Sequence, residues 1–132
     1  MPHSIIIDNE GKEITLAWVE NFFPERMNWT DAIKMCHDLI VSVSLVHNPD
    51  NWRLPTRKEV ISLIENNMMQ QLDAMERGLE FTGFNLSGKL IWTRDSVAEQ
   101  SNKAYIVDQN GNCSVVNKEE LRDVIAVTIC SH

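Results

Sequence analysis

The sequence predicts an α+β fold in which two or three helices pack on one mostly antiparallel sheet. Strand-like segments lie at both ends of the chain, amphipathic helical patterns lie between them, and glycine-containing turns join neighbouring strands. The first two strands are expected at 4–7 and 13–19, joined by a turn at Gly11. A chain of 132 residues is long enough for one domain with a hydrophobic core, so we expect a single domain over 1–132.

Two helices are expected in the middle of the chain. Asn28 is a typical N-cap for the first, and the apolar positions that follow recur at helical spacing. Thr56 with Glu59 three positions later forms a capping box that begins the second. Asn66-Asn67 predicts a break there, so residues 68–77 are expected to form a further short helix.

Four strand-like segments are expected after the helices. Asn110-Gly111 is a strong hairpin signal between two of them. The strands are expected at 89–93, 103–108, 113–117 and 124–130. The segments 81–88 and 94–103 are expected to be surface loops.

The charge of the chain bears on its partners. Nineteen acidic and twelve basic residues give a net charge of −7, with no clustered basic face, so nucleic acid and anionic membrane are not expected partners. The sequence shows neither a signal peptide nor an apolar run long enough to span a membrane. We therefore expect the protein in the cytoplasm or in a phage particle.

Several short motifs, in this order along the chain, resemble the Lcl C-terminal domain family of bacterial and phage proteins. They are the helix 28–36, the Trp-Arg-Leu-Pro-Thr stretch 52–56, Ile-Trp-Thr at 91–93, residues 104–107 before Asn-Gly, and the final strand 127–130. The resemblance implies a C-type-lectin-like fold. One departure is Trp-Thr-Arg-Asp at 92–95, where family members often have Trp-Ser-Ser-Thr.

The resemblance also implies structural roles for several positions of this chain. In C-type-lectin-like folds a disulfide commonly joins the first helix to the last strand, and Cys36 and Cys130 occupy those places. Two buried thiols packed side by side are the alternative, which a reducing compartment favours. Structural roles are expected for Trp29, Cys36, Trp52, Arg53, Pro55, Thr56, Trp92 and Cys130.

Neither a metal nor a catalytic site is expected. Residues 108–112 offer oxygens like those that begin a calcium loop, but the required later glutamate is missing, and a hairpin turn explains them. Cys36 and His37 are adjacent on a helix, so their side chains point about 100° apart. A copper oxidase related to the formylglycine-generating enzymes would need a cysteine pair, which Cys113 alone does not supply. We expect no cofactor and no enzymatic activity.

The remaining function is ligand binding. The resemblance implies a ligand face in the loops 81–88 and 94–103, which would contact a protein or a glycan. Candidate contacts are Phe84, Asn85, Arg94, Asp95, Glu99, Asn102 and Lys103. A solvated loop in which Arg94 pairs with Asp95 or Glu99 is the alternative. A different function is self-assembly through a helix face formed by Met68, Met69, Leu72 and Met75.

Overall fold

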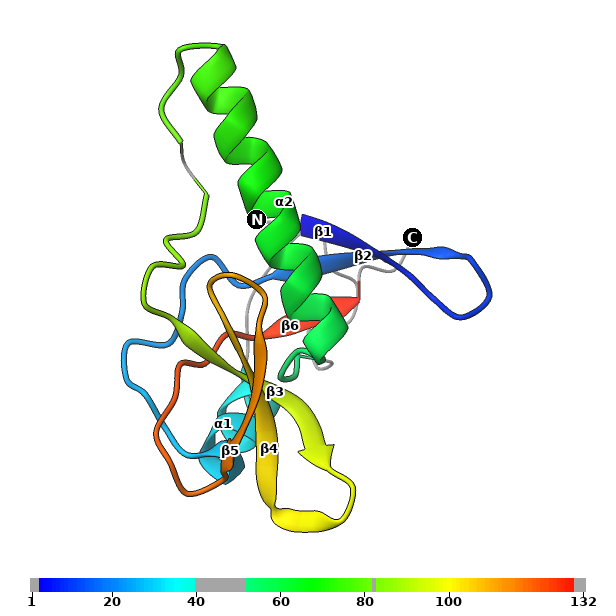
Figure 1. Ribbon diagram of the computed structural model, residues 1–132, viewed down its shortest axis with the longest axis vertical. Helices are drawn as coiled ribbons and strands as arrows, with labels where there is room; N and C mark the ends of the chain where they lie inside the picture. Colours follow the sequence, from blue (N-terminus) through cyan, green and yellow to red (C-terminus); the bar gives the residue numbers. More distant parts are fainter. Residues whose placement is uncertain (1–2, 40–51, 82, 130–132) are drawn as a thin grey trace.

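The computed structural model describes residues 3–39, 52–81 and 83–129. This part of the chain forms two three-stranded antiparallel sheets and two helices (Figure 1). In chain order the elements are β1 His3–Ile7, β2 Glu13–Trp18, α1 Trp29–His37, α2 Arg57–Glu76, β3 Leu90–Val97, β4 Gln100–Asp108, β5 Cys113–Asn117 and β6 Val127–Ile129. The predicted α+β class, with helices packed on antiparallel strands, is confirmed.

The prediction of one sheet is wrong, because β6 does not join the other C-terminal strands. Instead β6 pairs with β2, from Leu16 with Ile129 to Trp18 with Val127, and completes a sheet of order β1-β2-β6. The second sheet has the order β3-β4-β5. Asp123 connects the two sheets, since it forms a parallel bridge with Ile91 shortly before the chain enters β6.

The core consists of two clusters of buried side chains. One lies between α2 and the sheets and contains Leu16, Trp18, Val60, Leu63, Ile64, Phe84, Leu86, Ile91, Val107, Ile125 and Val127. The other lies beside α1 and contains Ala32, Cys36, Trp52, Leu54, Trp92, Ala104, Ile106, Val124 and Ala126. Trp52 and Trp92 are therefore structural, as predicted. Trp29 is only half-buried and packs at the edge of the second cluster, where its Nε1–H donates to the Thr93 carbonyl at 2.9 Å.

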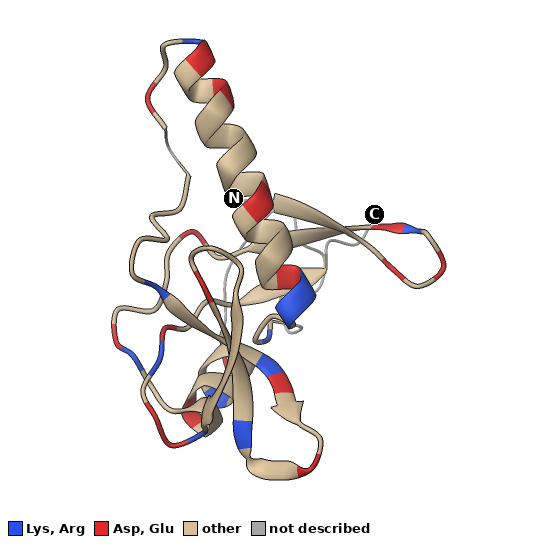
Figure 2. Cartoon of the chain, viewed as in Figure 1, with Lys and Arg blue, Asp and Glu red and all other residues tan. Residues whose placement is uncertain are grey.

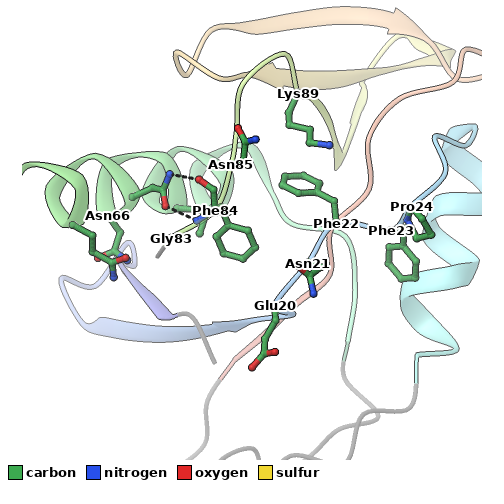
Figure 3. Close-up of a pocket in the computed structure, with 13 residues that line it drawn as sticks. Glu20, Asn21, Phe22, Phe23, Pro24, Asn66, Gly83, Phe84, Asn85 and Lys89 are labelled. Atoms are coloured by element: carbon green, nitrogen blue, oxygen red, sulfur yellow. Dashed lines mark hydrogen bonds between the residues drawn. The ribbon is translucent and has the colours of Figure 1, made fainter. Parts of the chain in front are cut away.

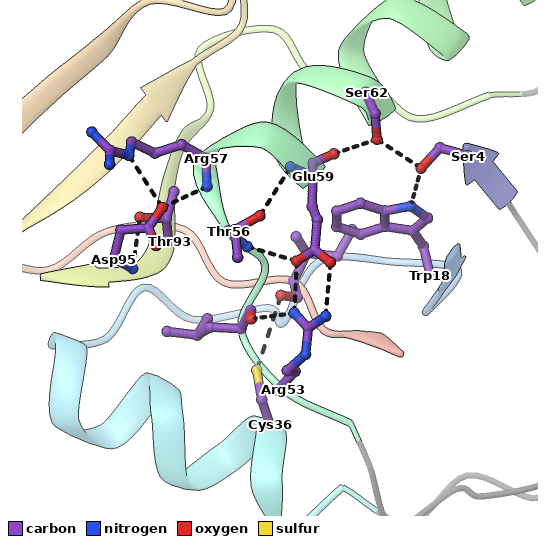
Figure 4. A network of polar contacts seen from close by, with 12 residues as sticks. Ser4, Trp18, Cys36, Arg53, Thr56, Arg57, Glu59, Ser62, Thr93 and Asp95 are labelled. Atoms are coloured by element: carbon purple, nitrogen blue, oxygen red, sulfur yellow. Dashed lines mark hydrogen bonds and ion pairs between the residues drawn. The ribbon is translucent and has the colours of Figure 1, made fainter. Parts of the chain in front are cut away.

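The stretch before α2 is held by the predicted capping box and by an ion pair (Figure 4). The backbone N–H of Glu59 donates to Thr56 Oγ1 at 3.2 Å, and the N–H of Thr56 donates to Glu59 Oε1 at 2.7 Å. The Arg53 guanidinium donates two hydrogen bonds to the same carboxylate, at 2.6 and 2.7 Å. The Pro55 carbonyl accepts the Arg94 N–H at 2.7 Å, which ties this stretch to β3.

Helix α2 runs unbroken through Asn66 and Asn67, so the predicted break is wrong. Side-chain amides destabilise a helix when they bond to its own backbone, and these two bond elsewhere. Asn66 Nδ2 donates to the His3 carbonyl at 2.8 Å, and Asn67 bonds to the backbone of Phe84. The helix ends as expected before Gly78, whose φ is +67°.

The predicted Asn-Gly hairpin joins β4 to β5. Gly111 has φ +86°, and Asp108 Oδ1 accepts the backbone N–H groups of Asn110 and Asn112 at 2.9 and 3.0 Å. These bonds, with that from Asn112 the strongest cause, lower the pKa of Asp108. Residues 108–112 resembled the start of a calcium loop, but the Asp108 carboxylate accepts hydrogen bonds from the backbone of the turn itself.

Candidate ligand-binding surface

The segment 83–88 lies along α2 and is fixed there by one buried amide. Asn67 Nδ2 donates to the Phe84 carbonyl, and the Phe84 N–H donates to Asn67 Oδ1, both at 2.9 Å. Gly83 lies beside this pair, where a Cβ atom would clash with Asn67 Oδ1 and with the Phe81 ring. The side-chain amide of Asn67 therefore pairs with the loop backbone as a neighbouring strand would.

Two hollows flank this anchored segment. The first has a volume of about 830 Å³ and is lined by Glu20, Asn21, Phe22, Phe23, Pro24, Leu63, Asn66, Asn67, Gln70, Gly83, Phe84, Asn85 and Lys89 (Figure 3). The second has a volume of about 460 Å³ and is lined by Ile64, Asn67, Met68, Gln71, Phe81, Gly83, Phe84, Asn85, Leu86, Ser87 and Gln109. Side-chain amides dominate the polar groups of both hollows.

The first hollow combines aromatic rings with a few polar groups. Phe22 and Phe84 meet edge to face, with ring centroids 6.0 Å apart and an interplanar angle of 81°. Lys89 Nζ lies 4.9 Å from the Phe22 ring centroid, and Asn85 stands at the same end of the hollow (Figure 3). Apolar walls with a small number of polar groups are typical of ligand sites.

The C-terminal half of α2 projects beyond the sheets (Figure 1). It carries exposed apolar side chains. We call this set the methionine face. It consists of Met68 at 58% exposed, Met69 at 68%, Leu72 at 55%, Met75 at 71% and, just after the helix, Leu79 at 61%. Met68 also lines the second hollow, so the methionine face continues into it.

The structure separates the two loops that were predicted to form one face. Residues 81–88 precede β3, whereas the turn between β3 and β4 lies at the far end of that strand (Figure 1). Phe84 and Asn85 lie at the first location. The other predicted contacts lie beyond it: Arg94 and Asp95 within β3, Glu99 in the turn, and Asn102 and Lys103 in β4. Only the first location adjoins the two hollows.

Two of the predicted contacts have roles within the fold. Phe84 is only 8% exposed and belongs to the core, so it forms a wall of the hollows and not a free contact. The Asp95 carboxylate accepts the N–H and Nε–H of Arg57 at 2.8 and 3.1 Å (Figure 4). The Arg57 guanidinium also stacks 3.9 Å from the Tyr105 ring centroid. Among the described residues, Asp95 pairs with Arg57 and not with Arg94.

The segment 94–103 is also not a loop over most of its length. Strand β3 continues to Val97 and β4 begins at Gln100, so these two residues close a tight hairpin. The register of the pair shifts twice beyond Trp92, which marks an irregular ladder. Such irregularity interrupts the alternation of buried and exposed side chains, so the strand could not be predicted from the sequence pattern.

Residues with catalytic chemistry are scattered over the described part of the chain. Among residues 3–39, 52–81 and 83–129, no group of three or more His, Cys, Asp or Glu side chains is placed to hold a metal ion. Cys36 is buried, and burial raises the pKa of its thiol to about 12. Cys113 is exposed. Cys130, and with it the expected proximity to Cys36, lies outside the described residues.

Four residues of this surface were not predicted from the sequence: Phe22, Asn67, Gln70 and Lys89. One signal for Asn67 was present, since it follows Val60 and Leu63 at helical spacing and so falls on the buried face of α2. A buried amide needs hydrogen-bond partners, and Asn67 finds them in the backbone N–H and carbonyl of Phe84.

A family model described as the Lcl C-terminal domain matches residues 7–128. The chain belongs to the Lcl C-terminal domain family. The matched range covers β2 to β5, both helices of the described chain and all of the surface described above. It includes only Ile7 of β1, and all of β6 except Ile129. The C-type-lectin-like topology expected for this Lcl C-terminal domain continues to rest on the family resemblance.

The other comparisons add little to the family assignment. Comparison with curated proteins gave no match. A chain from the solved complex of a mutant von Willebrand factor A1 domain with botrocetin aligns over 96% of this chain and 97% of that chain, at 11% sequence identity and a TM-score of 0.45. Neither helix in the described part of the chain has the length and apolarity to cross a membrane.

Proposed function

We propose that this Lcl C-terminal domain is a non-enzymatic binding module. It recognises another protein through a surface formed by the segment 83–88, the two hollows beside it and the methionine face of α2. The protein partner uses the hollows for its projecting side chains and the methionine face for its apolar surface. The hairpin 94–103, at the far end of β3, lies outside this surface.

The exposure of the methionine face is the observation that carries the proposal. Fully burying a leucine or methionine side chain is worth about 1.5–3 kcal/mol. More than half of each of the five residues of the methionine face is exposed, so more than half of that stabilisation is not realised in the isolated chain. Contiguous exposed apolar side chains on a soluble domain typically mark an interaction site. Met and aromatic residues are also enriched in protein interfaces.

A protein ligand fits this surface better than a glycan. Glycans are bound by dense hydrogen bonding to hydroxyl groups, and the methionine face offers no side-chain donor or acceptor stronger than a thioether. The amide-lined first hollow is where a glycan would bind in the alternative case. The absence of activity that we propose is supported by Cys36, whose protonated, buried thiol is a poor nucleophile.

A pull-down with purified protein as bait tests this function. Bacterial lysate and cell-surface extract are the samples, because the short motifs of the sequence resemble those of bacterial and phage proteins. Leu72→Gln with Met75→Gln alters the methionine face, and Asn85→Lys alters the first hollow. Val115→Gln, at a residue 44% exposed on β5, is the matched surface control, and Arg94→Ala with Lys103→Ala tests the hairpin.

The partner is expected with wild type and with both control baits, and is expected to be lost with the methionine-face and hollow variants. All substituted side chains are exposed or half-buried, so circular dichroism should show an unchanged fold. A partner that is lost only with the hairpin variant would contradict the proposed surface. A partner bound equally by every bait would contradict it as well.

Self-assembly is the second candidate function, and the same exposed residues favour it. In that case the methionine faces of two or more copies would bury one another. Light scattering on a sizing column distinguishes the two functions, because a binding module remains monomeric at high protein concentration. A defined oligomer that dissociates in the Leu72→Gln, Met75→Gln variant would favour self-assembly.

A further inference from the structure

Three exposed apolar residues of α2 form a stripe along one side of the helix. Met68, Leu72 and Met75 are separated by four and three positions, which places them on one face. The Leu79 N–H donates to the Ala74 carbonyl at 2.8 Å, and the Gly78 N–H donates to the Met75 carbonyl at 3.3 Å. This Schellman closure turns the chain back so that Leu79 directly follows the stripe.

The stripe is not the side of α2 that packs on the body of the protein. That side carries Val60, Leu63, Asn67 and Ala74, which are buried. Spacings of four and three are the pattern by which one helix packs against another. The exposed stripe therefore presents a helix-binding pattern with no helix of the described chain against it.

The charges around the stripe are mostly negative (Figure 2). Between residues 65 and 80 the chain has four acidic residues and one basic residue, and none of the charges falls between 66 and 72. The acidic residues are Glu65, Asp73, Glu76 and Glu80, all of them exposed.

The cations of α2 nearest to the stripe are already engaged. Arg77 Nε lies 3.2 Å from Asp73 Oδ1, so these two charges neutralise each other. The remaining charges near the stripe are all acidic. Lys58 donates to the Ile7 carbonyl at the other end of the helix. Glu65 and Glu76 stay on the flank of the stripe, since they lie three positions before Met68 and one after Met75.

We infer that the methionine face docks a basic amphipathic helix of the partner protein. Apolar side chains of that helix pack on Met68, Leu72 and Met75, and its lysines or arginines face Glu65 and Glu76. This inference rests on the proposed function and names the chemistry of its partner. A second copy of this chain fits less well, because pairing two methionine faces would bring two acidic flanks together.

Methionine suits such a docking surface. Its unbranched, polarisable side chain adapts to apolar groups of different shapes, and methionine-rich surfaces accept a range of amphipathic helices. The acidic flank adds orientation and selects against acidic helices, since like charges across an interface are unfavourable.

Fluorescence anisotropy with synthetic peptides tests the inference on the full chain. The probe is a labelled leucine–lysine peptide of ~18 residues, about five helical turns, with leucines on one face. One control peptide has glutamate in place of each lysine. Another has the leucine–lysine composition in an order that forms no apolar face, which measures attraction by charge alone.

The amphipathic lysine peptide is expected to bind at least tenfold more tightly than either control peptide, and more weakly as salt increases. Leu72→Gln with Met75→Gln is expected to weaken it at least tenfold. Glu65→Gln with Glu76→Gln is expected to weaken it severalfold and to reduce the salt dependence. Met35→Gln, at a methionine 46% exposed on α1, should leave binding unchanged.

Equal binding of the three peptides, or equal binding by wild type and the Leu72→Gln, Met75→Gln variant, would overturn the inference. So would a concentration-dependent dimer that excludes the peptide, since a second copy would then be the occupant. A different result would contradict the proposed function itself: a pull-down partner that binds the methionine-face variant and the Asn85→Lys variant as well as it binds wild type. A partner lost with Asn85→Lys while no peptide binds would leave that function standing and end this inference.

Discussion

Replacing Arg53 by methionine is expected to lower the free energy of unfolding by about 3–5 kcal/mol near neutral pH. Arg53 makes two bonds to the Glu59 carboxylate, at 2.6 and 2.7 Å, and Glu59 is only 3% exposed. The substitution keeps most of the volume of the side chain but leaves a buried charge without its partner. Urea denaturation followed by tryptophan fluorescence measures the loss.

The loss should depend on pH in a defined direction. Burial alone would raise the pKa of Glu59, but the hydrogen bonds from Arg53 and Thr56 outweigh it, and the pKa is lowered. In wild type, the resulting stability is present above the unfolded-state pKa of about 4.3 and is lost as pH falls through the folded-state value. Without Arg53, the effect of burial on Glu59 dominates and the pKa of its carboxyl is raised. The difference in unfolding free energy between wild type and variant should therefore shrink at low pH.

A surface ion pair supplies the control for Arg53. Arg77 and Asp73 are 67% and 59% exposed at their side chains, so Arg77→Met is expected to cost less than about 1 kcal/mol. Equal losses for the two substitutions, or a deficit in Arg53→Met that does not shrink near pH 4, would contradict the structural role of the buried pair.

Replacing Asn67 by alanine is expected to destabilise the protein by about 2–4 kcal/mol and to release the segment 83–86. The substitution leaves the buried N–H and carbonyl of Phe84 without partners, each of which costs about 1–3 kcal/mol. Chemical denaturation measures the loss, and hydrogen exchange should show a Phe84 amide that exchanges far faster than in wild type.

Gln70 is the matched control for Asn67. It lies three residues later on α2, lines the same hollow and is exposed, so Gln70→Ala should change stability by less than about 0.5 kcal/mol. Slow exchange at Phe84 in Asn67→Ala would show that the segment is held by packing and not by the Asn67 amide.

Local signals in the sequence predicted several parts of the fold correctly. The capping box at Thr56, the N-cap at Asn28 and the hairpin at Gly111 depend on residues within four positions of one another. Interactions of such short range can be predicted from the local sequence alone. For the same reason the end of α2 at Gly78 was predictable from that one glycine.

Features that depend on distant contacts were not predictable. The continuity of α2 depends on Asn67 meeting Phe84, which is seventeen residues away. The two-sheet arrangement depends on β6 returning to β2, more than a hundred residues earlier in the chain. The binding surface could be predicted only in part, because the distance between 81–88 and 94–103 follows from the unbroken length of β3.

We propose above that a partner protein contacts the surface formed by α2 and the segment 83–88. Site-specific photocrosslinking can locate that contact, with a photoreactive amino acid in place of either Met75 or Asn102. Both positions are exposed, and they lie on the methionine face and on the β3–β4 hairpin. We expect a crosslinked partner from the Met75 position and none from the Asn102 position. A crosslink from the Asn102 position alone would contradict it.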